Sequence, residues 1–283
     1  MNVAVSIFQM VWMSFVQLVY LLGVLIACGL LLGYLEKLSN WLLVRAFGRK
    51  GVMLTAWLGT PVHELGHLLM CFLWGHRVTR VKLLQLNSPD GVLGYVEHEY
   101  NRNSLYQRVG NFFIGVGPLF SGIAALLLGM YYLVPQSFTA FQTEVQQLLI
   151  TGNVSFNGWT ITTGAALVIG KSFFTMENII RPSFWLFLLA AISISSHIAL
   201  SREDMRNSAN GLAAIFFILF LFNVVAKFFG IPSEQVIGKI AEYNAYVFAF
   251  ATVALFFSLL TLCLAFFFYQ INAFRRRRSN RWE

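Results

Sequence analysis

The sequence predicts an all-α integral membrane protein, a bundle of about six transmembrane helices with a short β-hairpin between spans two and three. Of its 283 residues, 58% are hydrophobic and 11% are charged, whereas a soluble domain carries roughly 25% charged residues. The mean hydropathy is +0.68. The apolar runs continue over about 20 residues, which favours membrane-spanning helices over the strands of a barrel. We therefore expect residues 1–283 to form a single multi-pass domain in a lipid bilayer.

Six apolar stretches are long enough to cross a bilayer with some tilt. They cover residues 11–35, 52–74, 109–133, 182–200, 211–230 and 247–270. The basic, amphipathic stretch 36–50 is typical of an interfacial helix, although an ordinary loop fits it equally well. The connection 134–181 is expected to form a small extramembrane cap or a half-inserted helix, with a turn-rich centre at 153–159.

A β-hairpin is predicted in residues 75–108. The segments R-V-T-R-V-K-L-L-Q at 77–85 and G-V-L-G-Y-V-E-H-E-Y at 91–100 alternate in polarity and are rich in β-formers. The N-S-P-D-G between them is a turn sequence. His76 and His98 are expected on the surface of this hairpin.

The net charge of +8 is spread over the loops and the basic tail 271–283. It is typical of membrane-surface charge, and because no nucleic-acid-binding motif accompanies it, nucleic acid is not an expected partner. The arginines of the tail predict that the C-terminus lies on the cytoplasmic side of the membrane. The expected membrane is the cell membrane. Six crossings would put the N-terminus on the same side, but they would leave the basic stretch 36–50 outside, against the positive-inside rule. The cysteines lie in apolar runs, which favours packing over a disulfide framework; they are Cys28, Cys71 and Cys263.

The sequence H-E-L-G-H at 63–67 places three ionisable side chains inside an apolar stretch, where such residues are costly and indicate a functional site. Residues four apart share a helix face, so His63 and His67 can present ring nitrogens to one ion while Glu64 reaches a water beside it. This is the H-E-x-x-H arrangement of zinc hydrolases. The alternative is a pair of buried histidines that make hydrogen bonds between helices.

A catalytic zinc site needs a third protein ligand and an open position. The chain has two aspartates, and Asp90 is explained by the predicted turn. Asp204 is therefore the first candidate, although it could instead cap the next helix or pair with a neighbouring arginine. His197 is the second candidate ligand, or a residue that supports the site from behind; a hydrogen-bonded core histidine is the alternative.

These residues resemble the site-2 protease family of intramembrane zinc metalloproteases, in particular its small bacterial members. The resemblance lies in H-E-L-G-H-L-L-M-C-F-L-W-G-H-R-V-T-R-V-K-L at 63–83, in G-V-G-P-L-F-S-G at 115–122 and in S-x-x-D at 201–204. It covers a metalloprotease-like core of about 52–212, which leaves extra helices in 1–50 and 211–270. The N-x-x-P-x-x-x-L-D-G segment of the better-known members is absent.

The resemblance implies a zinc metalloendopeptidase that acts in regulated intramembrane proteolysis. Zn²⁺ would be held by His63, His67 and Asp204, Glu64 would be the general base, and the partner would be a transmembrane protein substrate. The family's hairpin is a membrane-associated element on the cytoplasmic side. A substrate helix must unwind before hydrolysis, and the hairpin strands could pair with the unwound segment. Asn111 and Ser121 could line a water path, although packing between helices explains them as well.

Other functions use the same features. A zinc hydrolase acting on a lipid-linked substrate would need the same three side chains. A catalytically silent membrane-protein-binding relative is disfavoured because Glu64 is present. A transporter with a coupled His and Glu site is disfavoured because the chain lacks two similar halves.

Overall fold

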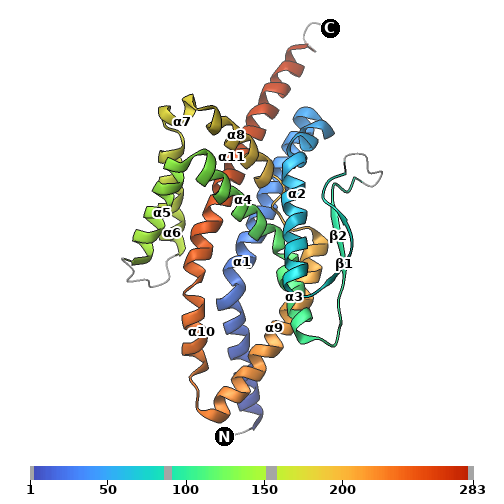
Figure 1. The fold of residues 1–283 in the computed structure, drawn as a ribbon, viewed down its shortest axis with the longest axis vertical. Coiled ribbons are helices and arrows are strands. Elements are labelled where there is room, and N and C mark those ends of the chain that lie inside the picture. The colour runs from blue at the N-terminus through green and yellow to red at the C-terminus, as the bar shows by residue number, and fades with distance from the viewer. Residues whose placement is uncertain (1–2, 86–90, 151–157, 280–283) are drawn as a thin grey trace.

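The computed structural model describes residues 3–85, 91–150 and 158–279. Over these residues the chain is an all-α membrane protein with one small sheet, and its longest helices follow the long axis of the molecule (Figure 1). They are α1 (Val3–Phe47), α9 (Arg202–Phe229) and α11 (Asn244–Ser279). α1 and α11 run in the same direction, and α9 runs in the opposite direction (Figure 1). α1 therefore begins at one end of the molecule and α11 ends at the other.

Among the described residues, three segments are long and apolar enough to cross a membrane, namely Ile7–Phe47, Arg202–Phe229 and Ser233–Arg275. The last of these includes α10 (Ser233–Ala241). A fourth span results if α3 (Leu105–Gly115) and α4 (Gly117–Leu133), which are bent by 52° at their junction, count as one.

Among the described residues, the helices that are long and apolar enough to cross are thus fewer than the six spans expected. α8 (Pro182–Ser195) has 14 residues, and a crossing takes about 20. α2 (Arg49–Leu73) carries the polar side chains of H-E-L-G-H and is not among the segments apolar enough to cross. The expected placement of both termini on one side of the membrane also differs from the opposite ends at which α1 begins and α11 ends (Figure 1).

The stretch 36–50 is not a separate interfacial helix. α1 continues to Phe47 because this part still packs against α11, with Trp41 beside Tyr269 and Phe47 beside Phe268. The chain then turns at Gly48, whose φ of 66° is the left-handed conformation that favours glycine. α2 begins at the next residue.

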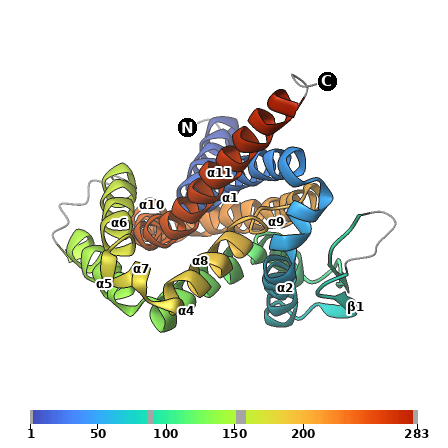
Figure 2. The ribbon, with the colours of Figure 1, turned by 90° about the horizontal axis from the view of Figure 1, so that it is seen from above.

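The connection 134–181 forms three helices, α5 (Pro135–Ile150), α6 (Gly158–Phe173) and α7 (Met176–Ile180). α5 and α6 lie on one side of the bundle, opposite the β-hairpin (Figure 2). Asn178 joins the ends of this unit, because its amide donates to Ser137 Oγ and to the carbonyls of Ser172 and Phe173. Most of the predicted turn-rich centre, 151–157, lies outside the described residues.

The predicted hairpin is confirmed. β1 (Arg77–Lys82) pairs in antiparallel register with β2 (Tyr95–Glu99), and the register shifts between Val78 and Arg80. The predicted turn with Asp90 lies outside the described residues.

α2 packs closely against α4 where two glycines face each other. A Cβ atom at Gly66 would lie 2.5 Å from the carbonyl oxygen of Gly117 and 2.5 Å from Ser121 Oγ. The Ser121 hydroxyl donates to the carbonyl of Val62 at 2.7 Å across the same contact. The small residues thus allow the backbones to approach, as is typical of helix pairs in membranes.

We predict that Gly66→Ala destabilises the fold by about 1–3 kcal/mol, because a methyl group there must push α2 and α4 apart. The measurement is the unfolding midpoint of the detergent-solubilised protein, followed by circular dichroism. Gly238→Ala in α10 is the matched control, since a Cβ there meets nothing within 4 Å. Equal midpoints for both variants would contradict this account of the helix contact.

Candidate metal centre

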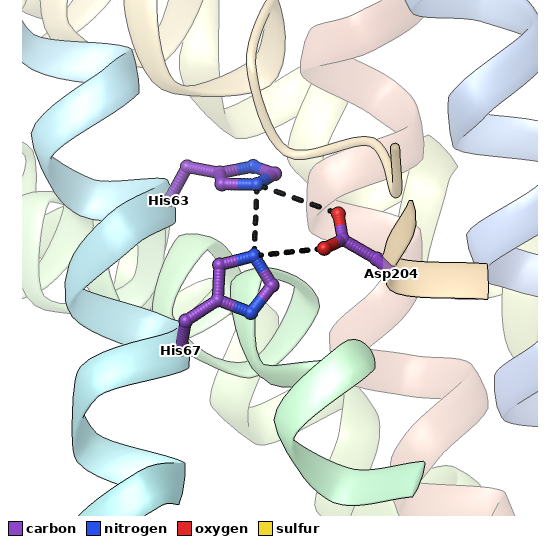
Figure 3. Close-up of side chains that lie close together, drawn as sticks. All are labelled: His63, His67 and Asp204. Atoms are coloured by element: carbon purple, nitrogen blue, oxygen red, sulfur yellow. Dashed lines mark hydrogen bonds and ion pairs between the residues drawn. The ribbon is translucent and has the colours of Figure 1, made fainter. Parts of the chain in front are cut away.

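His63 and His67 lie one turn apart on α2 and point their Nε2 atoms toward the same space (Figure 3). The two Nε2 atoms are 3.2 Å apart. His63 Nδ1 lies 2.7 Å from the carbonyl oxygen of His197, and His67 Nδ1 lies 2.8 Å from that of Ile114. A carbonyl oxygen only accepts, so each Nδ1 carries the ring proton and donates it. In the neutral rings both Nε2 atoms therefore present lone pairs to each other, an arrangement that a cation between them would stabilise.

Both acceptor carbonyls are available because of local breaks in helices. The normal helical partner of the Ile114 carbonyl would be the N–H of residue 118, which is a proline and has none. α3 ends there and the chain bends into α4. His197 lies beyond the end of α8, in the loop 196–201 that leads to α9. The proline four residues after Ile114 is a sequence signal that could have identified this carbonyl.

Asp204 enters the same space from the first turn of α9 (Figure 3). Its Oδ1 is 3.2 Å from His67 Nε2, and its Oδ2 is 3.7 Å from His63 Nε2. Asp204 and Ser201 form a capping box, in which Ser201 N–H donates to Oδ2 at 2.7 Å and Asp204 N–H donates to Ser201 Oγ. The predicted roles of cap and candidate ligand are thus compatible, because the cap holds one carboxylate oxygen while the other faces His67.

These three side chains form a group that could hold a metal ion. Their ligand atoms all lie within 4.8 Å of one another, and within the described part of the chain no other group of His, Cys, Asp or Glu does this. Ligand atoms about 2.0–2.1 Å from a tetrahedral ion lie about 3.3 Å apart, which is close to two of the three separations found here. Two imidazoles and a carboxylate are also a donor set that zinc accepts.

His197 is not a member of this group. Its Nδ1 donates to the carbonyl of Ser193 at 3.2 Å, and its buried Nε2 has no hydrogen-bond partner in the described structure. Its contribution to the site is the backbone carbonyl that orients His63. Of the two candidates for a third ligand, only Asp204 lies with both histidines.

Glu64 is buried beside the three side chains but is not part of their group. Gly94 of the hairpin segment covers it closely, since a Cβ at Gly94 would lie 2.7 Å from Glu64 Cγ. Two cavities meet at this point. The α1 cavity, of about 570 Å³, lies between α1, the hairpin and loop 196–201, and the β2 cavity, of about 370 Å³, lies between β2, α3 and α9. Both are lined by His63, Glu64, Gly94, Ser201 and Arg202. Glu64 therefore borders both cavities.

Ser121 and Asn111 do not line either cavity. The Ser121 hydroxyl bonds the carbonyl of Val62 between α2 and α4, and Asn111 is buried in α3. For Ser121, the structure thus supports packing between helices.

The sequence had led us to expect both His76 and His98 on the surface of the hairpin, but His76 is buried and His98 is half-buried. His76 is 5% exposed, stacks on Tyr100 and lies 2.8 Å through Nε2 from the carbonyl of Gln107. That contact requires a proton on Nε2, so Nδ1 accepts the 3.0 Å hydrogen bond from His98 Nδ1. Burial lowers the pKa of both rings, and for His98, where the nearby His76 and His67 add to the effect, to about 4.

In comparisons with known proteins, no family model, no curated protein and no solved structure matches this chain.

We predict that the hairpin loosens as the pH falls from 6.5 to about 4. The pKa of His98 in the fold lies below its ordinary value of 6.5, so protonation favours the detached hairpin over that interval, and the stabilising contact is fully present only above it. Protonated His76 would also direct an N–H at the N–H of His98. Hydrogen exchange of residues 77–82 and 95–99, corrected for intrinsic rates, should show protection reduced roughly tenfold at pH 5 relative to pH 7.5.

His98→Phe provides the control for this prediction, because it keeps a ring at the contact and removes the titrating group. Its protection should change much less between the two pH values. A wild-type protein with equal protection at both would contradict the prediction.

Proposed function

We propose that this protein is an intramembrane zinc metalloprotease that hydrolyses a peptide bond of a transmembrane protein substrate. The observation that carries the proposal is the convergence of His63 Nε2, His67 Nε2 and a carboxylate oxygen of Asp204 on one space beside Glu64. The resemblance of these segments to the site-2 proteases supports the same reaction.

His63, His67 and Asp204 would hold the ion. The proton on each Nδ1 is committed to a backbone carbonyl, so the rings are oriented with Nε2 free for a metal, which is the arrangement that carbonyl or carboxylate partners commonly impose on metal-binding histidines. Asp204 is likewise oriented by its bond from Ser201. When bound, the zinc ion would polarise the scissile carbonyl and make a water more acidic.

Glu64 is the proposed general base. It follows His63 directly on α2 and lies about 100° around the helix from it, so its carboxylate can reach a water beside the metal ligands without binding the ion itself. Glu64 would accept a proton from the attacking water and deliver it to the leaving amine. The close cover by Gly94 limits the space in which this carboxylate can move.

The two cavities support a chain substrate. A segment passing from the α1 cavity into the β2 cavity would cross Glu64, and β2 runs along the second of these. An extended segment could add to the hairpin there, because an unpaired strand edge offers backbone donors and acceptors. A lipid-linked substrate would not need this backbone pairing, and cleavage of a membrane-protein substrate separates the two possibilities.

We propose that the protein lies in the cell membrane with its C-terminus on the cytoplasmic side. The basic residues around the α1–α2 junction, Arg45, Arg49 and Lys50, occur at the end of the bundle where α11 ends, and Asn272 of α11 donates to the carbonyl of Ala46 there. Cationic residues of several segments thus gather at one end, as the positive-inside rule expects for the cytoplasmic side. This arrangement removes the conflict that six spans created for the stretch 36–50.

Glu64→Gln should retain bound zinc and lose cleavage by at least about 100-fold, because it removes the proton acceptor and none of the ligands. Asp204→Ala should lose both zinc and cleavage. The measurements are the zinc content of purified protein and the cleavage of a membrane-protein substrate in proteoliposomes. Asn223→Ala, which alters a polar contact between α1 and α9 away from the site, is the control. Full cleavage by Glu64→Gln would end the protease proposal.

Gly94→Ala should reduce cleavage about tenfold or more with zinc content unchanged, since the added methyl displaces the Glu64 side chain by direct contact while the ligands are untouched. Gly170→Ala is a matched control, because its Cβ meets only an ordinary contact with Phe256 at 3.6 Å. Normal cleavage by Gly94→Ala would show that the hairpin does not constrain the base.

A further inference from the structure

Glu36 is the one acidic residue of α1. It lies where the apolar part of α1 gives way to Lys37, Ser39 and Asn40, and an ionisable side chain in a membrane helix is costly and usually has a function. Among the ion pairs of the described residues, none involves Glu36. Its place in the membrane helix is therefore not explained by pairing with a cation.

The contact that Glu36 makes is with the loop behind the metal centre. Its Oε2 accepts a hydrogen bond from the backbone N–H of Ala199 at 2.8 Å. Ala199 lies midway in the loop between two residues that serve the site. Two residues earlier is His197, whose carbonyl accepts from His63 Nδ1. Two residues later is Ser201, which caps α9 and holds the Asp204 carboxylate.

The hydrogen bond from Ala199 to Glu36 therefore lies between His197, whose carbonyl orients His63, and Ser201, whose N–H orients Asp204. No other side chain of the described α1 accepts from this loop among the hydrogen bonds found. Without an acceptor at position 36, the Ala199 N–H would lose its partner in α1 and face the α1 cavity, so that α1 would no longer hold the backbone of the loop by this bond. A shift there would move the His197 carbonyl and the start of α9 together.

We propose that Glu36 is a positioning residue of the metal centre, which through the Ala199 N–H holds loop 196–201 so that His63 and Asp204 converge. The inference rests on the proposed function, since it takes His63, His67 and Asp204 to be metal ligands. It extends the centre to α1, a helix outside the part of the chain that carries the resemblance. Among the hydrogen bonds and ion pairs of the described residues, Glu36 makes none to the three proposed ligands or to Glu64.

The test compares metal affinity in variants that differ only in what position 36 offers to Ala199. Glu36→Leu keeps a side chain of similar size, suits a membrane helix and removes the acceptor. Glu36→Gln keeps a carbonyl oxygen that can accept the same bond. Zinc affinity is measured by competition with a chromophoric chelator, and the visible spectrum of the Co²⁺-loaded protein reports the ligand geometry.

We expect Glu36→Leu to weaken zinc binding by about 10- to 100-fold, the usual effect of removing a group that orients a ligand, and to change the Co²⁺ spectrum. Glu36→Gln should bind within about threefold of the wild type. Hydrogen exchange at Ala199 should be fast in Glu36→Leu and slow in the other two proteins. Glu36→Ala is a second loss variant should the leucine variant not yield folded protein.

Asn223→Leu is the structural control. Asn223 of α9 bonds Gln17 and Ser14 of α1, and Gln17 is about 28 Å along the helix from Glu36. Equal losses of zinc affinity in Asn223→Leu and Glu36→Leu would overturn the inference, because a general loosening of α1 would then explain both. Unchanged affinity in Glu36→Leu, or an equal loss in Glu36→Gln, would overturn it as well. A wild-type protein that binds no zinc would instead refute the proposed function, and this inference with it.

Discussion

The centre depends on two hydrogen bonds that join imidazole rings of one helix to backbone carbonyls of two others. His63 donates to the carbonyl of His197 and His67 donates to that of Ile114. In the neutral rings this leaves both Nε2 atoms unprotonated and facing each other. Each acceptor exists because a helix is interrupted, by Pro118 in one case and by the end of α8 in the other. The breaks in the bundle are thus what make this polar site possible.

The surrounding helices bury Glu64, His67 and Asp204 of this polar cluster. α1, α9 and α11 provide the length needed to span a bilayer, whereas the shorter or more polar α2, α3 and α8 pack around the site. Small residues let these helices approach the centre, as at Gly66 against Gly117 and at Gly115 against the backbone of Asp204. Irregular backbone in a membrane protein is tolerated where protein covers it, and residues 196–198 of loop 196–201 are buried.

Prediction from the sequence succeeded where a local pattern reports a local structure. The alternation at 77–85 and 91–100 identified both strands, and H-E-L-G-H identified a helix face with two histidines. It failed where helices continue or shorten through tertiary packing. The amphipathic stretch at 36–50 joins α1 because α11 covers it, and His76 is buried because Tyr100 and Gln107 enclose it. α11 is far in sequence from residues 36–50, and Tyr100 and Gln107 lie more than 20 residues after His76.

The sequence by itself determined the membrane class, the helix that carries His63, Glu64 and His67, and the choice of two residues as a third candidate ligand. These follow from composition and from the four-residue spacing of one helix face. Only the tertiary structure showed that Asp204, and not His197, lies with both histidines, because this depends on which atoms approach across about 140 residues of chain, a matter of helix packing. It likewise brought Glu36 to Ala199, 163 residues apart, a contact that no local pattern encodes.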